Sequence, residues 1–303
     1  MEKIDLAISY TWEYDEDFVN LIKELAHQFQ LSTLVIREDN LADVTEKLKR
    51  RAITILSYLD RASDASEEFE EIAHILTRRN TKIFNPYKLV AHAIDKASMH
   101  LEFITAGLHT PYSIIIPPVS EKEQIFISLD DLAMLGRPFI IKPANTTGGG
   151  IGVVTGAETL KQVLEERRTN HQDKYLLQET IYPHQLDNKR AWFRCFWAFG
   201  KVIPAWWDDL THLYTEITPE EINKFGLQEL FRITRKIARL TGLDYFSTEI
   251  VHSTKDQFII VDYVNDQCDM RFQSKHYDGV PETMVKQIIF NMIKTIKKIR
   301  RIK

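Results

Sequence analysis

The chain has 303 residues, of which 44% are hydrophobic and 27% charged, with a net charge of −4 and a pI of about 6.2. This composition is ordinary for a globular protein with two domains or one large one, and it gives no general argument for binding nucleic acid or a membrane. No apolar run approaches the ~20 residues that span a bilayer, and the N-terminus has no signal-peptide core. The two cysteines, Cys195 and Cys268, match no disulfide framework or metal spacing, so we expect a cytoplasmic protein.

The first 87 residues alternate between short apolar runs and amphipathic segments. We expect strands at 4–10, 31–36, 52–59 and 82–85, and helices at 16–29, at about 40–50 with Asn40 as its cap, and from about 66. This alternation predicts an α/β domain with a parallel sheet covered on both faces. The loop after the first strand has no glycine for a phosphate-binding turn, and its Trp12 and Tyr14 either face a ligand or pack on the surface.

The chain after residue 88 centres on a glycine-rich hairpin. An expected helix at 88–106, a strand at 110–117 and a helix at 129–135 lead to an apolar run, 139–141, that ends in Lys142. A second β-like run follows the glycines, which are Gly148, Gly149, Gly150 and Gly152. Glycines let backbone N–H groups close on an anion, and the lysine can neutralise the same phosphates. No helix follows, so neither the dinucleotide fingerprint nor the Walker A loop fits; a flexible surface hairpin is the alternative.

The last third of the chain places charged residues inside apolar strands. We expect helices at 157–168 and 227–240, a helix starting at Thr218, and strands at 175–181, 243–251 and 258–264, the last two containing Glu249 and Asp262. An aromatic hairpin at 191–206 carries Arg194, which indicates either a site or a structural ion pair. The final helix, 282–302, ends in a basic run that complements the helix dipole, with contact to nucleic acid or anionic lipid as the alternative.

The order of these features resembles the ATP-grasp superfamily, the fold of biotin carboxylase, glutathione synthetase and D-alanine–D-alanine ligase. A lysine-bearing helix, a lysine–glycine hairpin, a Gln-Glu segment, an arginine-bearing hairpin and two acidic strands follow one another from about Tyr87 to the C-terminus. The resemblance implies an α/β domain at 1–87 and an ATP-grasp domain at 88–303, α+β in character. The second would divide into a hairpin and lid subdomain, 88–183, and a metal and acceptor subdomain, 184–303.

The resemblance also implies ATP and Mg²⁺ as cofactors and a role for each matching residue. Lys142 and Lys96 would contact ATP phosphates, although each could be an ordinary solvated lysine. Arg194 and Arg271 would hold the transferred phosphate or a substrate carboxylate, although Arg271 could instead pair with Asp269 or Asp266. The remaining implied positions are the lid glycines Gly148, Gly149 and Gly150, the adenine-reading segment Gln178, Glu179, Thr180 and Ile181, and the metal ligands Glu249, Asp262 and Asn265.

One spacing departs from the family pattern. The family places its acid and asparagine two residues apart, whereas Asp262 and Asn265 are three apart. In a regular strand this spacing turns the two side chains to opposite faces, unless a bulge or the strand end intervenes. Asp266 and Asp269 are the alternative ligands.

The resemblance favours an ATP-dependent ligase that activates a carboxylate as an acyl phosphate for attack by an amine or similar nucleophile. Its partners would be a small-molecule or peptide carboxylate and an amine acceptor; we expect no membrane or nucleic-acid partner, and a homodimer stays open. Two alternatives remain. An ATP-grasp kinase would phosphorylate a hydroxyl, and a non-catalytic nucleotide-binding module would fit the altered spacing.

Overall fold

The first 84 residues form a parallel sheet with helices on both faces, as predicted. The computed structural model describes residues 2–145 and 152–302. The sheet has the order β2-β1-β3-β4, and every neighbouring pair is parallel. Its strands are β1 (Glu2–Tyr10), β2 (Thr33–Ile36), β3 (Ile53–Arg61) and β4 (Lys82–Phe84), and its helices are α1 (Glu16–Gln28), α2 (Glu38–Lys49) and α3 (Glu70–Thr77). Short 3₁₀ turns at Glu13–Asp15 and Glu67–Phe69 precede α1 and α3.

Several helix bounds predicted from the sequence are wrong, including the start of the helix expected at 157–168, which begins at Leu160 as α7 (Leu160–Thr169). Helix α2 begins at Glu38, so Asn40 lies inside its first turn, where its side chain accepts a hydrogen bond from the Arg37 backbone N–H. The single helix expected at 88–106 is two helices, α4 (Tyr87–Ala93) and α5 (Lys96–Thr105). Asp95 separates them because its carboxylate caps the backbone N–H of Ser98, which starts a new helix.

A four-stranded antiparallel sheet with the order β5-β8-β6-β7 follows. Its elements are β5 (Ser113–Ile116), α6 (Leu129–Leu135), β6 (Phe139–Pro143), β7 (Val154–Ala157), α7 (Leu160–Thr169) and β8 (Tyr175–Glu179). Strands β6 and β7 pair as the expected hairpin. The predicted lid residues Gly148, Gly149 and Gly150 lie outside the described residues. Apolar side chains from both helices and the sheet form a separate core that includes Leu135, Ile141 and Val163.

The second antiparallel sheet has five strands in the order β13-β12-β11-β14-β15. After the small hairpin β9 (Gln185–Leu186) and β10 (Lys189–Arg190), its elements are β11 (Trp192–Ala198), β12 (Lys201–Trp207), β13 (Tyr214–Glu216), α8 (Pro219–Lys224), α9 (Gln228–Thr241), β14 (Tyr245–His252) and β15 (Phe258–Asn265). One face packs on α9 through a core that includes Phe193, Ile237 and Phe246. The chain ends in α10 (Glu282–Ile302), which has the predicted bounds.

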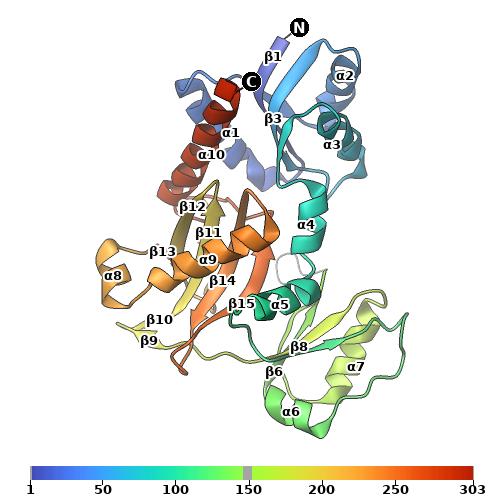
Figure 1. Ribbon diagram of the computed structural model, residues 1–303, viewed down its shortest axis with the longest axis vertical. Helices are drawn as coiled ribbons and strands as arrows, with labels where there is room; N and C mark the ends of the chain where they lie inside the picture. Colours follow the sequence, from blue (N-terminus) through green and yellow to red (C-terminus); the bar gives the residue numbers. More distant parts are fainter. Residues whose placement is uncertain (1, 146–151, 303) are drawn as a thin grey trace.

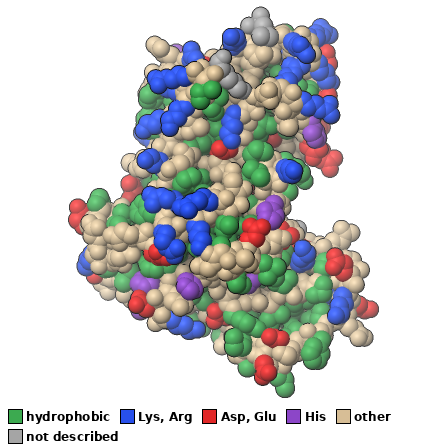
Figure 2. Space-filling view, viewed as in Figure 1, with side chains coloured by type: hydrophobic (Ala, Val, Ile, Leu, Met, Phe, Trp, Pro, Cys, Tyr) green, Lys and Arg blue, Asp and Glu red, His purple; other side chains and the backbone are tan. Residues whose placement is uncertain are grey.

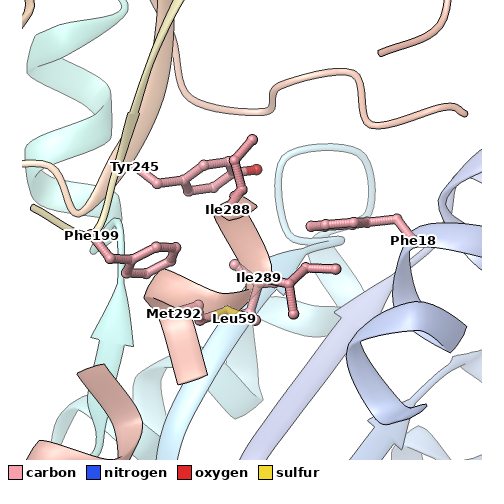
Figure 3. A pocket seen from close by; sticks show the side chains of 7 residues that line it. All are labelled: Phe18, Leu59, Phe199, Tyr245, Ile288, Ile289 and Met292. Atoms are coloured by element: carbon pink, nitrogen blue, oxygen red, sulfur yellow. The ribbon is translucent and has the colours of Figure 1, made fainter. Parts of the chain in front are cut away.

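The three sheets lie one above another, and α10 joins the upper two (Figure 1). Its apolar side packs between the parallel sheet and the five-stranded sheet, so one core contains Ile8, Tyr245 and Ile289. Figure 3 shows side chains from these elements turned toward one another around a small apolar pocket. The basic C-terminal end of α10 contacts the parallel sheet and α1: Arg300 pairs with Asp5 at 3.3 Å, and the Lys297 amine lies 5.2 Å from the Phe29 ring centre.

The described surface is mixed in character. Figure 2 shows Lys and Arg side chains gathered over α9, where Arg232, Arg235 and Arg239 are located. Apolar side chains gather over the lowest part of the molecule, where Phe126 and Leu129 are exposed. In the described part of the chain, no helix has both the length and the apolar character that a membrane span requires.

A buried ion pair ties the parallel sheet to the five-stranded sheet. The Arg61 guanidinium donates to both carboxylate oxygens of Asp15, at 2.8 and 2.7 Å, and to the Tyr245 hydroxyl at 2.6 Å. Both charged side chains are only 3% exposed. Loss of one partner would leave the other charge buried without compensation.

We expect Arg61→Met to lower the free energy of unfolding by about 3–5 kcal/mol, because Asp15 would keep an uncompensated buried charge. Urea denaturation measures the change. The matched control is Lys49→Met, which removes an exposed partner of Glu71 and should cost no more than about 1 kcal/mol. Equal losses in the two variants would contradict a special role for the buried pair.

Candidate active site

The amine of Lys142 links the four-stranded sheet to the five-stranded sheet. Lys142 lies on β6, and its Nζ donates to the backbone carbonyl of Val261 on β15 at 2.9 Å. Burial lowers the pKa of Lys142, while the nearby negative charges of Asp262 and Glu249 oppose that shift. The lysine therefore meets the two predicted metal carboxylates where the sheets join.

One bulge in β15 explains the unusual spacing of Asp262 and Asn265. Asp262 pairs with Glu249 on β14, and Asn265 pairs with Ser247, so the β15 segment carries one more residue than the β14 segment opposite it. Ser247 and Glu249 are two apart on a strand that pairs regularly with β11, and they share a face. Cross-strand partners also share a face, so the extra residue puts Asn265 on the same face as Asp262. A second extra residue lies between the pairs Glu249–Asp262 and Ile250–Ile260.

Glu249 is held by two donors from β11. The Arg194 guanidinium lies 3.0 Å from its Oε1, and the Trp192 indole N–H donates to its Oε2 at 3.0 Å. Arg194 also donates to the Tyr214 hydroxyl at 3.2 Å and lies 5.1 Å from the ring centre of Trp207. Its Nε is buried and has no hydrogen-bond partner among the described residues. Arg194 is therefore both a structural partner and a cation directed at the carboxylate pair.

The two carboxylates have opposite pKa shifts. Burial raises the pKa of Glu249, and the charge of Asp262 adds to that rise against the opposing effect of Arg194. Burial also raises the pKa of Asp262, but the positive charges of Lys96, Lys142 and Arg194 outweigh it and lower that pKa below its ordinary value. Two carboxylates and an amide oxygen are hard oxygen donors of the kind that Mg²⁺ prefers. Their chemistry and shared face fit a magnesium site.

Lys96 reaches this cluster from α5. It is the first residue of that helix, and its backbone N–H donates to the Ala144 carbonyl at 3.2 Å, just beyond β6. Its positive charge acts on both Asp262 and Lys142. The break between α4 and α5, which the sequence analysis missed, is what places Lys96 at a helix start beside the end of β6.

The predicted adenine-reading segment lies at the end of β8. The Gln178 side chain is buried and donates to the Tyr263 hydroxyl at 3.3 Å. The Glu179 carboxylate accepts the Tyr112 backbone N–H at 2.8 Å, and the Thr180 hydroxyl donates to the Pro138 carbonyl at 2.8 Å. Ile181 packs against a small apolar cluster that includes Val251, Ile259, Val261 and Trp192. These side chains fix the segment in place.

Arg271 does not join the cluster around Glu249. Its guanidinium pairs with Asp269 at 2.7 Å and with Asp278 at 2.9 Å, and it lies 5.8 Å from the ring centre of Trp12. Trp12 and Tyr14 are 41% and 44% exposed, so this corner remains open to solvent. The structure therefore gives Arg271 the ion pair that was the alternative from sequence, beside an aromatic corner.

Asp266, the alternative metal ligand, lies in a different environment from Asp262. Burial and the charge of Asp64 raise its pKa to about 6, and Arg61 opposes that rise. These neighbours belong to the parallel sheet and the loop after it. Asn265 is therefore better placed than Asp266 to join the carboxylate pair.

The residues that the sequence analysis missed are Tyr214 and Trp192, which hold Arg194 and Glu249. Trp192 belonged to the aromatic hairpin at 191–206, whereas Tyr214 lies beyond it and gave no such signal. Neither cysteine belongs to the site, because both are buried and burial raises the pKa of each thiol to about 12.

Comparison with solved structures identifies the fold. D-alanine–D-alanine ligase from Bacillus anthracis, complexed with ATP, matches 100% of this chain and 99% of its own, with a TM-score of 0.66 and 14% identity. The chain adopts the ATP-grasp fold. An ATP-grasp RimK domain protein from Sphaerobacter thermophilus DSM 20745 matches 96% of this chain and 99% of its own, with a TM-score of 0.64 and 15% identity. The ATP-grasp ligase PsnB, complexed with minimal precursor, Mg and ADP, matches 95% of this chain and 98% of its own, with a TM-score of 0.61 and 14% identity.

The fold predicted from the order of motifs is thus confirmed. No model of a known protein family matches the sequence, and no curated protein matches it. With identities of 14% and 15%, the likeness to these ATP-grasp proteins is a likeness of fold. The roles of individual residues depend on the geometry described above.

We expect Arg194→Met to lower the free energy of unfolding by about 3 kcal/mol, because Glu249 would face Asp262 without its nearest cation. Urea denaturation of Arg194→Met, Glu249→Gln and the double variant completes a cycle. The loss in the double variant should fall short of the summed single losses by about 1 kcal/mol or more. Strict additivity would show that the two side chains do not stabilise each other.

Proposed function

We propose that this protein is an ATP- and Mg²⁺-dependent ligase that activates a carboxylate as an acyl phosphate and joins it to an amine. The observation that supports this most is the meeting of Lys142, Arg194, Glu249 and Asp262 at the junction of the two antiparallel sheets. In a chain with the ATP-grasp fold, this junction combines cations for phosphate oxygens with carboxylates for a metal ion.

The lysines would bind the nucleotide phosphates. Lys142 on β6 and Lys96 at the start of α5 both place a positive charge near Asp262. The Lys142 amine donates one hydrogen bond to a neutral backbone carbonyl, and its other N–H groups could donate to phosphate oxygens. Phosphoryl transfer depends mainly on positioning and charge stabilisation, which such cations supply.

Glu249, Asp262 and Asn265 would hold Mg²⁺. When bound there, Mg²⁺ would neutralise charge on the phosphate oxygens. A cation would also relieve the repulsion between the two carboxylates, which contributes to the raised pKa of Glu249. The β15 bulge supports Asn265 as the third ligand. It also accounts for the three-residue spacing of Asp262 and Asn265, which was the feature that favoured a non-catalytic module.

Arg194 would orient the reacting groups. In the first step an oxygen of the substrate carboxylate attacks the γ-phosphorus of ATP, and the bond to ADP breaks. In the second step the amine nitrogen attacks the acyl carbon, phosphate leaves with the bonding pair, and the amine loses a proton to solvent or phosphate. The guanidinium, with an Nε that lacks a partner among the described residues, has a donor available for an anionic oxygen.

The likeness to solved ATP-grasp ligases supports a proposal for the substrate class. One neighbour is a D-alanine–D-alanine ligase, and a structure of PsnB is complexed with a precursor peptide and AMPPNP. We therefore propose an amino acid or peptide carboxylate as the activated group. Arg271, beside the exposed Trp12, is our candidate for a contact to the substrate.

We expect Mg-ATP at ~100 times its Kd to stabilise the protein by ~2.7 kcal/mol, and we expect Lys142→Ala to lose most of that gain. Thermal melts with and without millimolar Mg-ATP measure it. Lys161→Ala, which removes an exposed lysine from α7, should keep the full shift. No shift in the unmodified protein would sink the proposal, and an unchanged shift in Lys142→Ala would make this lysine structural only.

We expect Asp262→Asn to reduce Mg²⁺-dependent phosphate release by on the order of 100-fold or more. Its melting temperature without metal should fall modestly, because the attraction of Asp262 to Lys96, Lys142 and Arg194 outweighs the cost of its burial. Phosphate release is measured with candidate amino acids and peptides, with the exposed α6 residue Asp130→Asn as the control. Undiminished release in Asp262→Asn would exclude this carboxylate as a metal ligand.

A further inference from the structure

Two histidines and an aspartate meet near the turn between β14 and β15. His184 follows β8, His252 is the last residue of β14, and Asp256 lies in the turn. One ligand atom from each lies within 4.8 Å of the others. Their imidazole and carboxylate groups are metal ligands, and this cluster has no part in the proposed function.

Backbone pairing holds the two histidines side by side. The His184 backbone N–H donates to the His252 carbonyl at 2.9 Å, and Ala191 bridges both residues through two further backbone hydrogen bonds of 2.8 and 2.9 Å. The ring centres are 4.9 Å apart. The His252 ring also stacks on Phe258, its cross-strand partner, with the ring centres 4.4 Å apart and the planes 4° from parallel. The orientation of His252 is therefore set by β15.

The polar atoms of His252 are only partly satisfied. Its Nε2 lies 2.9 Å from the Asp256 carboxylate, while its Nδ1 is buried and has no hydrogen-bond partner in the described residues. The His252 side chain is 13% exposed and that of Asp256 is 87% exposed. An ion could therefore reach the cluster from solvent on the Asp256 side, while backbone hydrogen bonds hold the two histidines in place on the other side.

Alternation along β14 separates this cluster from the candidate active site. Strand β14 pairs with β11 without a register shift. Glu249 and His252 are three residues apart on it and so face opposite sides of the sheet. The two groups of ligands also differ in chemistry, since Mg²⁺ prefers oxygen donors whereas two imidazoles and a carboxylate suit Zn²⁺.

We propose that His184, His252 and Asp256 form a binding site for a divalent transition metal ion of the Zn²⁺ type, with water as the remaining ligand. Zn–N and Zn–O bonds of about 2.1 Å in a tetrahedron place ligand atoms about 3.4 Å apart. The present separations, all within 4.8 Å, are close to that arrangement, and the exposed Asp256 side chain is free to adjust.

The ion is structural in this proposal. The Thr254 backbone N–H donates to the Tyr182 carbonyl at 3.0 Å, and Pro183 forms a β-bridge with Ser253. The same turn brings the Lys255 amine to 3.9 Å from the Glu179 carboxylate. The ion would therefore fasten the segment after β8 to the β14–β15 turn, and binding to the folded state alone would raise the stability of the protein.

Calorimetric titration of the chelator-treated full chain with Zn²⁺ tests the site, and Co²⁺ reports its geometry through the visible bands of a tetrahedral ion. We expect one Zn²⁺ per chain, a higher melting temperature with Zn²⁺, and at least about tenfold weaker binding in His184→Ala and in Asp256→Asn. Asp256→Asn changes an exposed side chain and should fold normally, so it keeps the test valid if a histidine variant fails to fold. His171→Ala, an exposed histidine elsewhere, should bind as tightly as the unmodified chain.

Two results would overturn the proposal. One is the absence of Zn²⁺ binding at micromolar concentrations to the unmodified chain. The other is equal affinity in the unmodified chain, His184→Ala and Asp256→Asn, which would place any bound ion elsewhere. Neither result bears on Mg-ATP binding, so this test and those of the proposed function fail independently.

Discussion

The charge of the half-buried Lys142 amine, at the junction of two sheets, must be compensated, and the five-stranded sheet supplies that compensation. The amine bonds to the Val261 carbonyl, and its charge is opposed by those of Asp262 and Glu249. Burial disfavours the charged form of Lys142, so the two carboxylates must lie close to its amine to keep it charged. The same carboxylates repel each other and need cations, which Arg194, Lys96 and Lys142 supply. The candidate site is thus one electrostatic unit, and its parts come from the start of α5, from β6, and from three strands of the five-stranded sheet.

Much of this arrangement could be predicted from local sequence. The bounds of α6 and α10 match the prediction because each has clear apolar periodicity, and α6 also has a capping serine, Ser128. Charged residues in apolar strands marked Arg194, Glu249 and Asp262, because such residues need partners. Those three do lie together. Apolar periodicity and the cost of burying a charge both show within a short segment. They can therefore be recognised in a single sequence without knowledge of the fold.

What the sequence left open or missed concerns features that the rest of the fold determines. The bulge that brings Asn265 beside Asp262 depends on how β15 pairs with β14, and the segment alone gave only the odd spacing. Helix periodicity continued through Asp95, although its carboxylate starts a new helix there. The bond from Arg61 to Tyr245 joins residues 184 positions apart and left no local sign. Arg271 attracted attention as a charged residue near the acidic strand, but Asp278, seven residues later, provides an ion pair that sequence spacing did not single out.

The β14–β15 pair shows how one hairpin can offer two different sets of ligands. Along β14 the pleat is regular, so Glu249 and His252 face opposite sides. Along β15 two extra residues interrupt the pleat, and they gather Asp262 and Asn265 onto the side that Glu249 occupies. Next to the turn, β14 and β15 pair regularly. There, on the other side of the sheet, Phe258 stacks on His252 and holds its ring toward His184. Oxygen donors thus collect on one side and imidazoles on the other, so the hairpin separates a site for a hard cation from one for a softer ion. Because both sets share the strands that position Glu249, an ion at the histidines would also stiffen the support of the carboxylate pair.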